Sequence, residues 1–303
     1  MVKLEYTFKN DALFKMLFVK YPDLLKSLIA ELLGIRLESI GQFEVTNPEI
    51  PPESLGDKFC FLDINMTVDG QRVVLEIQVN DGKDYPERSL YYWAREYSTA
   101  LSEGQEYLVL PRTIIISIMA FKLFDCAELH SEFQALEVTR HTPLTDKMSL
   151  HYFELPKLPA TISADNGLLL WLSLFNAETE EELKQIEALE VPVMEQAIGA
   201  YRHITATDEF KEIERLRSRA RHNEASALGH ARREEREKWQ GVVAEKDAAL
   251  AGKDAVLAEK EVTLAEKDAV LAEKEVTLAE KDATLAEKDA LISELRARLG
   301  EDK

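Results

Sequence analysis

The chain has 303 residues, 46% of them hydrophobic and 31% charged, and its formal net charge at pH 7 is −19. This length is sufficient for one domain of about 200 residues with a sizeable core, followed by an appendage. A uniformly acidic surface repels phosphate, so the composition does not support nucleic-acid binding. Any such site must be local and depend on a basic rim, a bound metal or both.

The first predicted elements are two helices. Apolar spacing from Asp11 to Phe18 predicts a helix that Asn10 or Thr7 caps. Asp11 lies in the first turn of this helix, where the helix dipole favours an anion. A second helix is predicted over residues 23–33, ending at Gly34.

Residues 59–80 predict a β-hairpin. The Asp69-Gly70 pair between two alternating runs is typical of a two-residue type I′ turn. The register that this turn sets places Asp63 opposite Glu76, with Gln78 further along the same face. Alternate residues form an apolar face, which fixes the register because a slip by one residue would bury the carboxylates.

Two directly opposed carboxylates repel and need a cation, a shared proton or strong solvation. Mg²⁺, or alternatively Mn²⁺, suits oxygen ligands such as Asp63 and Glu76. Such a metal could polarise a phosphoryl oxygen and lower the pKa of a bound water, and Gln78 could orient that water or the phosphate. The alternative is a solvent-exposed polar face on which Arg72 relieves the repulsion.

The rest of the first region alternates strands with helices. A helix is predicted from Asp84 towards Gly104, with Pro86 near its first position. Buried strands are predicted over residues 112–121 and 149–155, and helices over residues 167–176 and from residue 178 onwards. This order predicts an α/β or α+β sandwich around a central sheet.

Three regions differ in pattern. Residues 1–200 contain all ten prolines and predict a globular domain. Residues 201–240 predict an arginine-rich helical connector. Residues 241–300 predict a heptad-repeat coiled coil, because leucines recur every seven residues from Leu250 onwards.

The seam of this coiled coil is weak. If the leucines take the a positions, lysines such as Lys260 take the d positions, and a seam of alanines is the alternative. Residues 254–267 recur identically as residues 268–281. We expect the tail to act as a spacer or to join copies of the chain into a homo-oligomer, a dimer or higher.

No run of residues predicts a transmembrane helix, since the most apolar one, residues 167–175, is much shorter than the roughly 20 residues that a bilayer span needs. The N-terminus lacks the apolar stretch of a signal peptide. Cys60 and Cys126 are too few for a disulfide framework. These features predict a cytoplasmic protein, and without a P-loop or Gly-x-Gly-x-x-Gly motif the sequence does not indicate ATP-driven activity.

Seven segments, in this order along the chain, resemble one nuclease group. They are Asn10–Phe18, Leu62–Asn65, Leu75–Gln78, Tyr85–Trp93, Ile116–Ile118, Tyr152–Lys157 and Ala227–Arg233. On these residues the chain resembles the PD-(D/E)XK nuclease superfamily, and within it the recombination-promoting nucleases, or PD-(D/E)XK nuclease family transposases. The resemblance implies a restriction-endonuclease-like core, with a central mixed sheet flanked by helices. It also implies a Mg²⁺-dependent DNA endonuclease that hydrolyses phosphodiester bonds in DNA recombination or transposition.

The resemblance assigns roles to particular residues. Asp63 matches the motif aspartate, and Glu76 matches the acidic residue of the (D/E)-x-K element. Gln78 stands where the superfamily has lysine and cannot supply a positive charge, so metal binding is better supported than rapid cutting. Asp11 is expected to approach the metal from the first helix, as an acidic residue does in some superfamily members; the alternative is a helix-start anion.

Several other side chains have two interpretations. Arg88, Tyr92 and Arg95 share one side of a predicted helix and either contact DNA phosphates or pack on the sheet. Lys15 is a further candidate DNA contact. The Glu154-x-x-Lys157 pattern imitates a catalytic motif, but an ion pair at the end of a strand is the preferred interpretation.

A protein of a different class is the alternative to the nuclease. It would be a catalytically inactive nuclease fold that serves as an interaction protein and displays a coiled-coil oligomerisation arm. The intact set of Asp63, Glu76 and Gln78 favours the nuclease, because loss of activity during evolution should have removed one of them.

Overall fold

A computed structural model describes residues 2–46 and 64–300. The chain divides into two units, which meet between Ala220 and Arg221. The helices and strands, in chain order, are α1 (Asp11–Lys20), α2 (Pro22–Leu33), β1 (Phe43–Val45), β2 (Ile64–Val68), β3 (Gln71–Gln78), α3 (Tyr85–Ser98), β4 (Thr113–Met119), β5 (His130–Phe133), β6 (Met148–Glu154), α4 (Gly167–Asn176), α5 (Glu180–Glu187), α6 (Pro192–Ala206) and α7 (Asp208–Leu299).

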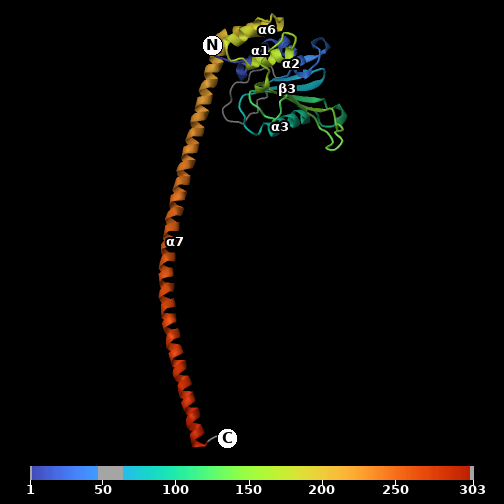
Figure 1. The fold of residues 1–303 in the computed structure, drawn as a ribbon. Helices are drawn as coiled ribbons and strands as arrows, with labels where there is room; N and C mark the ends of the chain where they lie inside the picture. Colours follow the sequence, from blue (N-terminus) through green and yellow to red (C-terminus); the bar gives the residue numbers. More distant parts are fainter. Residues whose placement is uncertain (1, 47–63, 301–303) are drawn as a thin grey trace. The chain divides into compact units, whose positions relative to one another are not determined.

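The strands of the first unit form a mixed sheet. Over the described residues it has six strands in the order β1-β2-β3-β4-β6-β5. The central strands β3, β4 and β6 are parallel, whereas β1, β2 and β5 join the sheet antiparallel to their neighbours. Helices cover both faces, with α1, α2 and α6 on one side of β3 and α3 on the other (Figure 1). The predicted fold class is therefore confirmed.

The β2–β3 hairpin has the predicted turn and register. Asp69 and Gly70 both have positive φ angles, 47° and 77°, as a type I′ turn requires. The register follows from the turn, since Val68 pairs with Gln71 and the pairing continues to the end of the described strand. Asp63, expected opposite Glu76, lies outside the described residues.

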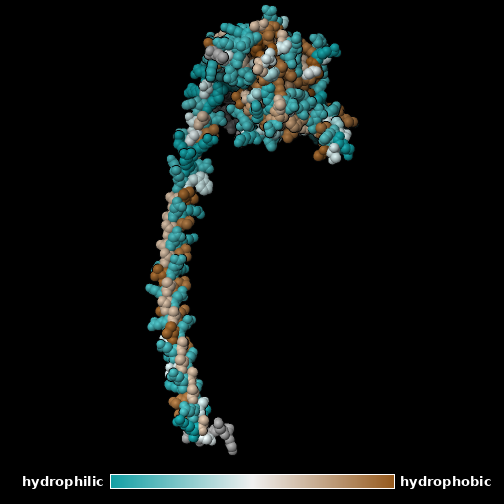
Figure 2. Space-filling model, viewed as in Figure 1, coloured by the Kyte–Doolittle hydropathy of each residue, from teal (hydrophilic) through white to brown (hydrophobic). Residues whose placement is uncertain are grey.

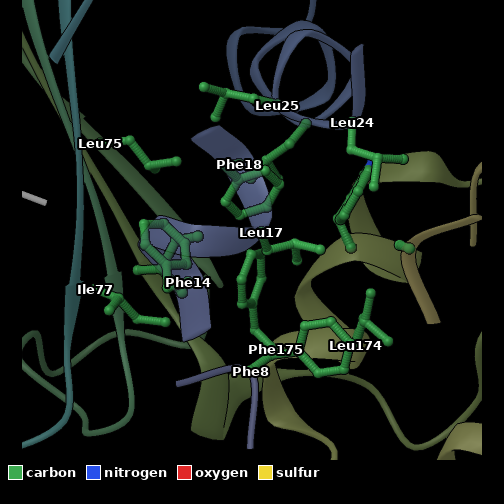
Figure 3. Close-up of a cluster of buried hydrophobic side chains, with 14 of the residues drawn as sticks. Phe8, Phe14, Leu17, Phe18, Leu24, Leu25, Leu75, Ile77, Leu174 and Phe175 are labelled. Carbon is green, nitrogen blue, oxygen red and sulfur yellow. The ribbon is translucent and has the colours of Figure 1, made fainter. Parts of the chain in front are cut away.

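The first face of the sheet buries the main core. Phe14 and Phe18 of α1 lie between β3 and α4, with Leu75 and Ile77 on one side and Phe175 on the other (Figure 3). The side chain of Asn10 accepts a hydrogen bond from the backbone N–H of Leu13 at 2.9 Å and caps α1, as predicted. This cap and the aromatic packing fix α1 against the strand that carries the candidate site.

The second face of the sheet is covered by α3 through polar as well as apolar contacts. Val74 and Ile115 are buried there in a smaller cluster. The Trp93 indole donates to the backbone carbonyl of Thr113 at 3.1 Å. The expected polar face is therefore an interior one, formed between the sheet and a helix.

This arrangement contradicts the alternative of a solvent-exposed polar face. The Glu76 side chain is buried, at 1% exposure. Arg72, expected near the carboxylates in that alternative, instead donates to the backbone carbonyl of Glu96 at 2.7 Å and to the Thr99 hydroxyl at 2.8 Å. It anchors the C-terminal end of α3. Val79, which alternation along the hairpin would place on the apolar face, follows the last residue of β3 and is exposed.

The first turns of α7 belong to the first unit. Phe210 and Glu214 are buried, and Glu209 forms a 2.8 Å ion pair with Lys20 of α1. Because of these contacts the compact unit extends to Ala220, further than the expected domain end near residue 200. The arginine-rich segment therefore begins inside the compact unit.

The second unit is helical up to Leu299. Its leucines at seven-residue spacing are exposed, from 56% at Leu285 to 61% at Leu250, and apolar and polar side chains alternate along the visible side of α7 (Figure 2). The coiled coil itself needs a partner helix and stays a prediction. Among the described residues, no helix is long and apolar enough to cross a membrane.

Candidate functional site

The candidate site lies at the end of β3, on the face that α3 covers. Alternation along the strand sends Val74 into the cluster under α3, and Glu76 and Gln78 follow on the same face. Glu76 is buried and Gln78 is half-buried. A strand that is buried on both faces thus places a carboxylate in an interior position, where a charge needs polar partners.

Gln78 links the strand to the helix. Its Nε2 donates to Glu76 Oε2 at 3.2 Å, and its Oε1 accepts from Nη2 of Arg88 at 2.7 Å. The amide therefore uses its donor towards a carboxylate and its acceptor towards a guanidinium. These contacts form a chain that runs from Glu76 through Gln78 to Arg88.

Tyr85 and Arg88 lie one turn apart on α3, the helix that covers these hydrogen bonds. The Arg88 guanidinium lies over the Tyr85 ring, 4.9 Å from its centroid. Burial raises the pKa of the Tyr85 hydroxyl well above its ordinary value, and the nearby negative charge of Glu76 raises it further. The hydroxyl stays protonated and donates to Ser117 Oγ at 2.8 Å.

The four predicted DNA contacts differ in their exposure and in the face of the sheet on which they lie. Arg88 is half-buried and held at the site by Gln78. Tyr92 is buried, at 7% exposure, whereas Arg95, also on α3, is exposed. Lys15 is half-buried on α1, which covers the other face of the sheet. These four residues do not form one exposed surface.

Asp11 begins α1, as expected. Its carboxylate forms an ion pair with Arg217 and accepts a hydrogen bond from the backbone N–H of Ala12 at 3.0 Å. Among the described contacts of Asp11, none is with Glu76 or Gln78. Its role as a metal ligand stays a prediction, and the structure adds a cationic partner that would compete for this carboxylate.

The predicted metal site includes a residue that the structure does not describe. Asp63 immediately precedes the described part of β2, whose first residue, Ile64, pairs with Leu75. Within residues 2–46 and 64–300, no group of three or more His, Cys, Asp or Glu side chains could hold a metal ion. The role of Asp63 as a ligand therefore stays a prediction.

Glu154 and Lys157 form the expected ion pair at the end of β6. Their charged atoms are 2.6 Å apart, and both side chains are buried. The parallel register aligns Gln78 with Met119 and Met119 with Glu154. The pair therefore lies at the same end of the sheet as Gln78, two strands away.

Sequence reasoning missed Tyr85 and Ser117 as parts of the site. Both are buried polar groups in segments that carry the family resemblance, but the sequence assigned neither of them a role. The spacing of Tyr85, Ser89 and Trp93 on one side of α3, each donating to or sharing a hydrogen bond with the sheet, could have indicated a helix with a polar inner side.

A mixed sheet with a parallel centre and helices on both faces, carrying an acidic residue two positions before Gln78 on β3, defines a nuclease-like fold of the PD-(D/E)XK type. A family model described as PD-(D/E)XK nuclease family transposase matches residues 8–231, more than half of the chain. The chain belongs to this family. No curated protein and no solved structure matches the chain.

Family membership carries several general implications. It indicates a nuclease- or transposase-like function with DNA as the substrate. PD-(D/E)XK nucleases generally use divalent metal ions. The matched region ends at Ala231, before the identical repeats of the tail begin.

Proposed function

We propose that this protein is a Mg²⁺-dependent DNA endonuclease, with Mn²⁺ as an alternative cofactor, that acts in DNA recombination or transposition. The observation that carries the proposal is the buried Glu76 carboxylate at the end of β3, bonded to Gln78 on the same face. The interior position matters because electrostatic interactions are stronger away from water. A carboxylate held there is suited to a tightly bound cation.

The donor set fits such a cation. Glu76 provides carboxylate oxygens, which Mg²⁺ prefers. If the register between Ile64 and Leu75 continues by one residue, Asp63 faces Glu76 with the β-carbons about 5 Å apart. These two residues would hold the metal, and Asp11 is the proposed third ligand. When bound, a divalent cation would supply polarisation of a phosphoryl oxygen and acidification of water.

The reaction is the hydrolysis of a phosphodiester bond. A water oxygen bonds to phosphorus as one P–O ester bond breaks, the water gives up a proton, and the leaving oxygen takes one from solvent. Gln78 can orient the attacking water or the phosphate from its fixed position between Glu76 and Arg88. The products are a phosphomonoester and a hydroxyl end.

DNA would approach along the helix α3 side of the site. Arg95 is exposed on α3 and is the proposed contact to the phosphate backbone. Tyr92, which is buried, and Lys15 on α1 stay weaker candidates for this role. The overall charge of −19 makes such local cations necessary for binding.

The exposed leucines of the tail favour a homo-oligomer formed through the C-terminal helices. Leu257, Leu264 and Leu271 are each at least 57% exposed in the single chain and recur in the period of a coiled coil. Paired copies would place two sites on one DNA and permit a cut in each strand. We place this activity in the cytoplasm, in keeping with the low cysteine content.

The test is plasmid cleavage with Mg²⁺ or Mn²⁺ by the full chain and by the variants Asp63→Asn and Glu76→Gln. Each variant keeps the shape of the side chain and removes its charge. Glu87→Gln serves as the matched control, since Glu87 is exposed on α3 near the site. We expect cutting by the wild type and the control and loss of cutting in both site variants.

Binding of Mn²⁺, measured by calorimetry, provides a readout that is independent of cutting. We expect both site variants to bind the ion more weakly than the wild type and the Glu87→Gln control to bind it normally. Equal cutting by all four proteins would refute the site. A wild type that is inactive with both metals would favour the catalytically inactive interaction protein.

A further inference from the structure

Gln78 departs from the lysine of its superfamily by lacking a positive charge. A lysine at this position carries three donors and no acceptor, whereas glutamine carries a donor and an acceptor. The acceptor of Gln78 is used, because its Oε1 takes a hydrogen bond from Arg88 at 2.7 Å. The cation that is missing from the strand is therefore present on the neighbouring helix.

The orientation of the Gln78 amide is fixed by its two partners. The nitrogen faces the Glu76 carboxylate, and the oxygen faces the Arg88 guanidinium. A flipped amide would set oxygen against oxygen at Glu76 and N–H against N–H at Arg88, so only the observed orientation satisfies both. Gln78 thereby connects an anion to a cation without carrying a charge itself.

Arg88 is itself held in place. Its guanidinium lies over the Tyr85 ring, and the Tyr85 hydroxyl is bonded to Ser117 on β4. Among the described residues, the Nε of Arg88 is buried and has no hydrogen-bond partner. The Arg88 side chain bonds to the sheet through Gln78, and one of its N–H donors is not used there. Arg95 on the same helix is exposed.

We propose that Arg88 provides, through Gln78, the positive charge that a lysine would bring to the end of β3. In this role Arg88 is a positioning residue of the cleavage site and not a contact to the DNA backbone. The proposal rests on the proposed endonuclease function and concerns the same site. It assigns the function of the superfamily lysine to Gln78 and Arg88 together.

If Arg88 supplies the charge that a lysine at position 78 would supply, substitutions at these two positions should compensate for each other. Arg88→Ala leaves Gln78 without its cation, and Gln78→Lys sets two cations side by side. The double variant Gln78→Lys/Arg88→Ala restores one cation next to Glu76. It should therefore cut DNA faster than Arg88→Ala and resist urea better than Gln78→Lys, although each single change is harmful.

The kinetic test uses a DNA duplex cut under single-turnover conditions at saturating enzyme. We expect Arg88→Ala to slow cleavage on the order of 100-fold, as for the loss of one positioned donor, while Arg88→Lys recovers part of the rate. The double variant should cut at least about tenfold faster than Arg88→Ala, a gain of about 1.4 kcal/mol. Arg140→Ala, which changes an exposed arginine, is the control.

DNA binding distinguishes this role from a phosphate contact. The dissociation constant of Arg88→Ala and its dependence on salt, measured by fluorescence anisotropy in the presence of Ca²⁺, should match those of the wild type. A phosphate contact predicts weaker binding, a salt slope lower by about one and a normal rate at saturation. That result, or failure of the double variant to exceed Arg88→Ala, would overturn the proposal.

A measurement that needs no cleavage tests the contact itself. Urea unfolding of Gln78→Ala, Arg88→Ala and their combination forms a double-mutant cycle, in which we expect the midpoint shift of the combination to be smaller than the summed single shifts. Additive shifts would overturn the proposal even if the wild type cuts DNA. An inactive wild type with a coupled pair would refute the endonuclease and leave the contact without a catalytic role.

Discussion

The Tyr85 hydroxyl donates to Ser117 Oγ at 2.8 Å and joins the first turn of α3 to the centre of β4. Because Arg88 lies one turn further along the same helix, this bond also determines where the guanidinium meets β3. We expect Tyr85→Phe to lower the free energy of unfolding by about 1 kcal/mol, since a buried hydroxyl on Ser117 loses its donor. Urea unfolding measures this loss, and unchanged stability would contradict the bond.

His151 makes the stability of the first unit depend on pH. Burial lowers the pKa of His151 to about 4, against the opposing effect of Glu132, with smaller lowering effects from His130 and Arg112. The folded protein therefore keeps this imidazole neutral at a pH where the unfolded chain protonates it.

The sign of the effect follows from this difference. Between pH 6.5 and about 4 the unfolded chain binds more protons, so the free energy of unfolding should fall as the pH falls, by up to about 3 kcal/mol in total. His151→Gln should show a shallower fall between pH 6.5 and 5, measured as urea midpoints. Burial also lowers the pKa of His130 and leaves the variant some slope. Identical pH profiles would contradict the prediction.

Arg95 should affect DNA binding rather than the chemical step. It is exposed on α3, so Arg95→Ala should weaken DNA binding and reduce the salt slope by about one, with the cleavage rate at saturation preserved. Anisotropy titrations at several salt concentrations measure both quantities. A salt slope equal to that of the wild type would remove Arg95 from the proposed DNA contacts.

The tail should set the oligomeric state. A chain that ends after Lys238 lacks every leucine of the seven-residue repeat but keeps the whole compact unit. We expect it to be a smaller assembly than the full chain at the same molar concentration, as determined by light scattering. Equal numbers of copies in the two proteins would mean that the repeat does not join them.

Much of the fold could be predicted because local patterns determine it. The Asp69-Gly70 turn determines the register of the hairpin, and Asn10 and Gly34 mark helix ends through a side-chain cap and a left-handed conformation. Strand β5 was missed because its edge position leaves most of its residues, such as Glu132, exposed, so no apolar alternation marks it. Strand β1, also at an edge of the sheet, was not predicted for the same reason.

The candidate site could be predicted only in part. Glu76 and Gln78 share a face because alternation within one strand requires it, and their face followed from the sequence. The contact between Gln78 and Arg88 depends on how α3 lies on the sheet, which the tertiary contacts of Tyr85 and Ser117 determine. No local pattern contains that information, and for this reason the sequence left open whether Arg88 contacts DNA phosphates or packs on the sheet.

The identical segments of the tail, residues 254–267 and 268–281, each span two heptads. Adding or removing one such copy would change the helix by about 21 Å, and every later leucine would keep its phase. Neighbouring charges in each repeat lie one or two positions apart, where helical side chains do not face each other, so no intrahelical ion pair would be lost. The length of the tail can therefore change in fixed increments while the nuclease-like unit stays the same.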